Sequence, residues 1–140
     1  MALSLRYVVM GFIAAAIAVV LVHQSIVFLL NTAGIWDKAP WSTAPTGPWG
    51  VPSILNSIFW GGLWGAVLAL AFNTLPGTAT WLKGLFFGWM IFLVSNCVVL
   101  PLIKGQPLFY SFDPAKLLSV FLILSGFGIA TALIYERLRG

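Results

Sequence analysis

The sequence predicts an all-α membrane protein with four transmembrane helices in up-down-up-down order. The chain of 140 residues is 61% hydrophobic and only 7% charged, whereas soluble domains carry about 25% charged residues. Four apolar stretches are each long enough to cross the roughly 30 Å hydrocarbon core of a bilayer. Segments rich in proline, glycine or charge separate these stretches. The length predicts a single transmembrane domain over residues 1–140.

The first predicted span covers residues 7–30 and contains no charged side chain. Its apolar run is too long for the core of a cleaved signal peptide, so we expect a retained helix. The polar triplet His23-Gln24-Ser25 interrupts the run. Polar side chains in hydrocarbon need partners and usually face the interior of a helix bundle. The triplet is therefore a candidate for the functional part of this span.

Residues 31–52 form a predicted outer loop that holds four of the eight prolines and three of the seven tryptophans. Proline at this density disfavours helix, and tryptophan is enriched where a membrane meets water. We expect an ordered cap, either a linker with interfacial anchors or a docking surface. The candidate docking residues are Trp36, Trp41 and Trp49.

The other three predicted spans cover residues 53–75, 81–103 and 115–135. Ser53 is predicted to cap the second helix, and Asp113-Pro114 has the pattern of a helix cap and first turn. Four spans place both termini on one side of the membrane. That side carries four basic residues and the other side carries three, an excess that predicts cytoplasmic termini.

The chain also has the pattern of a duplicated helical hairpin. An offset of 72 residues places His23-Gln24-Ser25 on Ser95-Asn96-Cys97, with aliphatic neighbours on both sides. An offset of 63 residues places Gly65 of the second span on Gly128 of the fourth. The two hairpins would then be related by an axis along the membrane normal.

The polar residues within the spans gather in the outer half of the predicted bundle. At 1.5 Å per residue, His23 and Asn96 each lie about 12 Å from the outer end of their helix. One interpretation is hydrogen bonding between helices that holds the bundle together. The other is an outward-facing pocket in which His23 titrates near neutral pH. The candidate pocket residues are His23, Gln24, Asn56, Trp60, Ser95 and Asn96.

Small residues spaced four apart form grooves that let another helix approach closely. The pattern predicts helix docking, either within the bundle or with a partner subunit. The glycines concerned are Gly61, Gly65, Gly84, Gly88 and Gly126. Trp60 and Trp64 share one face of the second span, where they either fill space or present an aromatic surface to a lipid or quinone.

Common enzyme motifs are missing from the sequence. No charged residue lies deep within a span, which disfavours an ion-coupled transporter or proton pump. His23 is the single histidine and Cys97 the single cysteine, so we expect no disulfide, metal site or cofactor. The basic residues are scattered at helix ends, which is typical of membrane anchors and not of nucleic-acid binding. We expect a protein that is not an enzyme.

Four stretches carry a resemblance to a known group of proteins. They are His23-Gln24, Gly50-Val51-Pro52, the FWGGLWG run from Phe59 to Gly65, and Lys104-Gly105-Gln106-Pro107. The chain resembles a group of short four-span bacterial membrane proteins of unknown activity over nearly its whole length. The resemblance implies a bacterial inner membrane and no catalytic residue.

Two functional hypotheses follow. The leading one is a non-catalytic accessory subunit of a larger membrane complex, which docks through the glycine grooves and the outer loop. The alternative is a module that binds or conducts a small molecule, a lipid or a quinone through a polar pocket around His23. The expected partners are membrane lipids, together with other integral membrane subunits or further copies of the chain.

Overall fold

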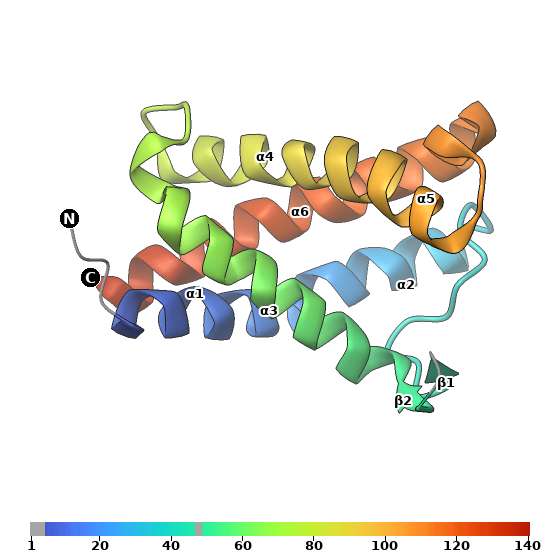
Figure 1. The fold of residues 1–140 in the computed structure, drawn as a ribbon, viewed down its shortest axis with the longest axis horizontal. Coiled ribbons are helices and arrows are strands. Elements are labelled where there is room, and N and C mark those ends of the chain that lie inside the picture. The colour runs from blue at the N-terminus through green and yellow to red at the C-terminus, as the bar shows by residue number, and fades with distance from the viewer. Residues whose placement is uncertain (1–4, 47–48) are drawn as a thin grey trace.

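The computed structural model of the protein describes residues 5–46 and 49–140. Residues 1–4, and residues 47–48 of the predicted outer loop, lie outside the described residues. Four helices are long and apolar enough to cross a membrane. The predicted all-α four-helix fold is confirmed. In Figure 1 the first turn of the first helix and the last turn of the fourth lie at the same end of the bundle.

The helices have the following bounds. The first span comprises α1 (Leu5–Ala18), a π-helical segment η1 (Val19–His23) and α2 (Gln24–Thr32). The second comprises α3 (Ser53–Ala71) and the 3-10 turn η2 (Phe72–Thr74). The third comprises α4 (Thr80–Ile91), a second π-helical segment η3 (Phe92–Val99) and α5 (Leu100–Lys104). The 3-10 turn η4 (Leu108–Phe112) precedes the fourth span, α6 (Pro114–Arg139). Each predicted span lies within these bounds or ends one residue beyond them.

The two predicted helix caps have different outcomes. Asp113 caps α6, because its carboxylate accepts hydrogen bonds from the backbone N–H groups of Ala115 at 3.0 Å and Lys116 at 3.4 Å. The prediction for Ser53 is wrong, since Ser53 is already the first helical residue and no side chain caps α3. Loop carbonyls take over this role: the N–H of Ser53 donates to Ala44 at 2.9 Å.

The outer loop contains a short antiparallel ribbon. Strand β1 (Pro45–Thr46) pairs with β2 (Val51–Pro52), in the register Pro45 opposite Pro52. The hydroxyl of Thr46 donates to the carbonyl of Val51 at 2.6 Å. The ribbon leads directly into α3, so it fixes where the outer end of that helix begins.

Glycine contacts hold each hairpin together. In the first hairpin α1 crosses α3 so closely that a Cβ on Gly11 would overlap the backbone of Gly65. In the second hairpin α4 crosses α6 in the same way, with Gly84 against Gly128. Such close approach gives the backbones extensive van der Waals contact, the main attraction between helices in lipid.

The structure shows that the two hairpins repeat each other. At an offset of 73 residues, the buried Gly11, Ala14, Ala15, Ala18 and Gln24 correspond to the buried Gly84, Phe87, Gly88, Ile91 and Cys97. The start of η1 falls on the start of η3 at the same offset. The offset of 72 predicted from the sequence is therefore wrong by one residue. That prediction aligned the polar residues of the two spans, whereas the buried residues are the ones that repeat. His23 corresponds to Asn96. The predicted offset of 63 agrees with the helix crossings, because Gly65 contacts Gly11 in the first hairpin as Gly128 contacts Gly84 in the second.

The bundle departs from this symmetry on one side. Helices α1 and α6 lie side by side along much of their length, whereas α3 and α4 have almost no close backbone contact. Ala14 and Ala18 leave room beside α1, but the corresponding residues of α4 are the much larger Phe87 and Ile91. The larger side chains hold α3 away from α4, and the two helices diverge toward the outer end (Figure 1).

Candidate functional site

Gln24 is at the centre of the polar group in the first span. Its side chain is buried, and its amide nitrogen lies 3.1 Å from Nδ1 of His23. Its amide oxygen accepts a hydrogen bond from the backbone N–H of Trp41 at 2.8 Å. The imidazole of His23 packs edge-on against Phe127 of α6, with ring centres 5.9 Å apart. The Gln24 amide thus links the first span to the outer loop.

Trp41 fastens the outer loop to η1. Its indole N–H donates to the backbone carbonyl of Val20 at 2.9 Å. In η1 the N–H of Gln24 bonds to the carbonyl of Val19, the wider spacing of a π-helix, which is frequent at functional sites. Trp41 itself has φ +46°, a conformation that is uncommon for a residue other than glycine. Both N–H groups of this predicted docking residue are used within the chain.

The other two loop tryptophans differ in exposure. Trp36 is half-buried and packs against the buried side chains of the bundle. Trp49 is 88% exposed. Of the three predicted docking residues, Trp49 therefore has the most surface available to a partner.

Asn56 and Trp60 form a second polar group on α3. The indole N–H of Trp60 donates to Oδ1 of Asn56 at 3.2 Å, as expected for residues one helical turn apart. The Trp60 side chain is 56% exposed. Within a membrane span, this pair places a hydrogen-bonded amide and a large aromatic ring on the surface of one helix.

Asn96 and Tyr110 form the third group. The phenol of Tyr110 donates to Oδ1 of Asn96 at 3.5 Å, and Ser95 is half-buried next to Asn96. Four successive residues, Phe109 to Phe112, have φ between +53° and +58°, a strained conformation for side chains of this size. Burial, with a smaller contribution from Cys97, raises the pKa of Tyr110 to about 12.

The six candidate pocket residues thus belong to separate groups. Over residues 5–46 and 49–140, no hydrogen bond connects His23 and Gln24 with Asn56 and Trp60, or either pair with Asn96. In the same part of the chain, every buried side-chain nitrogen and oxygen atom has a partner. The hydrogen bonds of each group run to adjacent residues or to one neighbouring loop.

The candidate docking glycines face helices of this same chain. A Cβ on Gly61 would lie 3.5 Å from Phe127, and one on Gly88 would overlap the carbonyl of Leu124. Gly65 and Gly84 lie in the crossings described above, and Gly126 lies against Ile26. The grooves are filled inside the bundle, so a partner subunit would need another surface.

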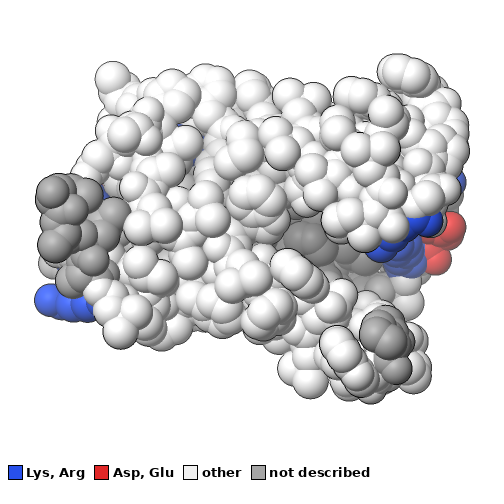
Figure 2. All heavy atoms as spheres, in the orientation of Figure 1, with Lys and Arg blue, Asp and Glu red and all other residues white. Residues whose placement is uncertain are grey.

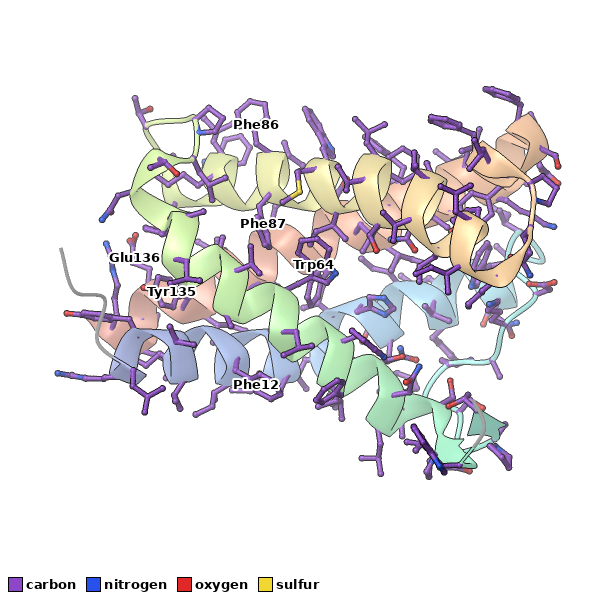
Figure 3. The ribbon with its side chains drawn as sticks, in the orientation of Figure 1. Phe12, Trp64, Phe86, Phe87, Tyr135 and Glu136 are labelled. Carbon is purple, nitrogen blue, oxygen red and sulfur yellow. The ribbon has the colours of Figure 1, made fainter. Side chains whose placement is uncertain are left out.

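A lateral cleft opens where α3 and the third span diverge. We define it as the space between residues 53–64 and residues 92–104, where Figure 2 shows the surface hollowed. At its narrow end the ring of Trp64 meets the ring of Phe87 edge-on, with centres 6.2 Å apart (Figure 3). Trp60 lies one turn outward from Trp64 on the same helix face, and we therefore assign its ring, which is 56% exposed, to the wall of the cleft.

Sequence reasoning missed two residues of this region. Phe87 holds the cleft open, and a comparison of the hairpins at the correct offset would have found it, because it stands where the first hairpin has Ala14. Tyr110 follows a loop and has no periodic pattern, so nothing in the sequence pairs it with Asn96.

The fold defines a four-helix protein of the multi-pass membrane class, with an opening on the side of the bundle. Among residues 5–46 and 49–140, no three His, Cys, Asp or Glu side chains gather as a metal site would need. We found no match to a protein-family model, a curated protein or a solved structure. The resemblance to short bacterial four-span proteins stays a prediction.

Proposed function

We propose that the protein is a non-catalytic membrane protein that binds a lipid-like molecule, such as a phospholipid or a quinone, in the lateral cleft. The observation that carries this proposal is the separation of α3 from α4, with the Phe87 ring between them. The equivalent pair of helices in the repeat, α6 and α1, lies in direct contact. A molecule that enters the opening comes from the side, where the apolar helix faces meet acyl chains. The occupant is therefore a molecule dissolved in the bilayer.

The chemistry of the walls supports a ligand with an apolar chain and a flat or weakly polar part. Trp60 offers an exposed indole ring, and aromatic rings contribute strongly to binding when they are covered. Asn56 can exchange its hydrogen bond with Trp60 for one to a ligand carbonyl or hydroxyl. Apolar surface around these groups favours a mainly hydrophobic ligand.

The test compares two tryptophans of similar exposure. Trp60 is 56% exposed and Trp81, at the inner end of α4, is 49% exposed. The protein is extracted in mild detergent, and its bound lipids and quinones are measured by native mass spectrometry for the wild type, Trp60→Ala and Trp81→Ala. We expect at least a tenfold weaker retention of the ligand in Trp60→Ala, because truncating a central aromatic contact costs about 2 kcal/mol. Equal retention by the two variants would contradict the proposal.

An accessory role in a larger complex is the second candidate, and the exposed Trp49 favours it. An indole that is 88% exposed on the loop of a fixed ribbon fits the aromatic anchors found at protein interfaces. Mild extraction from the native membrane, followed by a native gel and mass spectrometry, would then show a stoichiometric partner. Trp49→Ala should release that partner and Trp81→Ala should not.

We also propose a bacterial inner membrane with both termini in the cytoplasm. The end of the bundle with the termini holds Arg6, Lys83, Arg137 and Arg139 with Glu136, and the other end holds three lysines with two aspartates. The excess of basic residues supports this orientation. A reporter fused after Gly140 should be active only as a cytoplasmic reporter, and activity in a periplasmic reporter would reverse the assignment.

A further inference from the structure

The outer end of the bundle carries a second hollow, separate from the lateral cleft. It has a volume of about 350 Å³ and lies between the segment that follows α2 and the first turn of α6. Its lining residues are Gly34, Ile35, Trp36, Asp37, Asp113, Ala115 and Lys116. Because α2 ends and α6 begins here, the hollow lies at the level where a spanning bundle meets lipid headgroups.

The hollow contains charges of both signs. Asp37 and Asp113 supply two carboxylates, and Lys116 supplies one ammonium group. These are the two aspartates of the whole chain, and both line this one hollow. The ammonium group of Lys38 lies 6.0 Å from the ring centre of Trp36, another lining residue, so two carboxylates and two ammonium groups surround the hollow. Balanced charges of both signs suit a zwitterionic headgroup, whose cationic group is attracted to the carboxylates. Lys116, in turn, offers a partner to a phosphate.

One wall of the hollow is fixed in place before any ligand binds. The side-chain amide of Asn31 donates to the carbonyls of Trp36 and Lys38, both at 3.1 Å. Trp36 is also packed against the buried side chains of the bundle. Asp113 is held by its capping hydrogen bonds to α6. Little ordering is therefore needed when a ligand enters, which favours affinity.

We propose that this hollow binds the headgroup of a membrane lipid that carries a primary amine and a phosphate, as phosphatidylethanolamine does. The ammonium group would lie against Asp37 and Asp113, and the phosphate against Lys116. Carboxylates accept hydrogen bonds from a primary ammonium group, which a quaternary amine cannot donate. The site therefore distinguishes phosphatidylethanolamine from phosphatidylcholine as well as from phosphatidylglycerol.

The experiment compares the three dioleoyl lipids, which differ only in headgroup. Native mass spectrometry of the detergent-solubilised full chain gives a dissociation constant for each lipid. We expect phosphatidylethanolamine to bind at least tenfold more tightly than the other two. Equal affinities for the three lipids in the wild type would overturn the proposal, whatever the variants do.

Two variants then test whether the preference for phosphatidylethanolamine arises at this hollow. Asp37→Asn combined with Asp113→Asn removes both charges, while asparagine at position 113 still caps the helix. This double variant should lose the preference for phosphatidylethanolamine. Glu136→Gln removes a carboxylate at the other end of the bundle and should retain it. A preference that persists in the double variant would overturn the assignment to this hollow.

Discussion

Gly65 and Gly128, 63 residues apart, occupy the same place in two copies of one helix crossing. A Cβ on Gly65 would overlap the carbonyl of Gly11, and a Cβ on Gly128 would overlap the carbonyl of Gly84. Because backbone atoms cannot rotate away as a side chain can, both positions admit only glycine without a shift of the helices. The two hairpins therefore depend on the same contact for their stability.

Alanine at either of these positions should destabilise the protein. We expect Gly65→Ala and Gly128→Ala each to lower the free energy of unfolding by about 1 to 3 kcal/mol, the usual cost of overpacking. Gly126→Ala is the matched control, since its Cβ would meet the far end of the half-buried Ile26 side chain and no backbone atom, and it should cost less. Unfolding in mixed micelles by SDS titration measures all three. A Gly126→Ala effect as large as the others would argue against these backbone crossings.

Phe87 and Phe86 provide a second comparison. Phe87 is fully buried and holds the narrow end of the cleft with Trp64, whereas the half-buried Phe86 points away from the bundle beside Trp89 (Figure 3). Phe87→Ala should lower the free energy of unfolding by about 3 to 5 kcal/mol because it empties a packed site. Phe86→Ala should cost clearly less. Similar losses for both variants, measured by the same SDS titration, would show that Phe87 has no special role.

The bond between Trp41 and Val20 predicts a change in the outer loop. Trp41→Phe keeps an aromatic ring but leaves the Val20 carbonyl without its indole donor. The loss should be about 0.5 to 1.5 kcal/mol, and residues 33–44 should exchange their amide hydrogens faster. Trp49→Phe, at a ring that is 88% exposed, should leave exchange unchanged. Hydrogen exchange with mass spectrometry gives both results, and unchanged exchange in Trp41→Phe would exclude this attachment.

Tyr110 should titrate late. Burial raises its pKa to about 12, so the folded protein favours the neutral phenol and loses stability as pH rises from about 10, the value of a free phenol. Below pH 10 the phenol is neutral in both the folded and the unfolded protein, so the free energy of unfolding keeps its full value. The difference in phenolate absorbance between the wild type and Tyr110→Phe should have its midpoint near pH 12. A midpoint near 10 would mean that the phenol is open to water.

The spans and the Asp113 cap could be predicted because each depends on nearby sequence. A long apolar run by itself predicts a membrane span, and Asp113 bonds to N–H groups within three residues. The role of Ser53 could not be predicted, since the carbonyls that replace its side chain come from the folded loop at Ala44. A local sequence pattern therefore predicts only those contacts that lie close together in the chain.

The candidate site was harder to predict because its parts meet only in the folded bundle. Polarity singled out His23 and Asn96, but it did not reveal that Gln24 bonds to Trp41 or that Asn96 bonds to Tyr110. The π-helical segments η1 and η3 shift the faces of their helices by part of a turn. The cleft itself depends on the size of one side chain, Phe87, relative to Ala14 on the other hairpin.

The most direct test of the lateral cleft is to label whatever occupies it. The protein is reconstituted in vesicles of phospholipid that carries a photoactivatable diazirine on its acyl chain, illuminated, digested and mapped by mass spectrometry. We predict that adducts concentrate on residues 53–64 and 92–104, the two walls of the cleft, above the level on other exposed helix faces such as Val9 and Ile13. An even distribution of adducts over all exposed faces would contradict the proposed binding site.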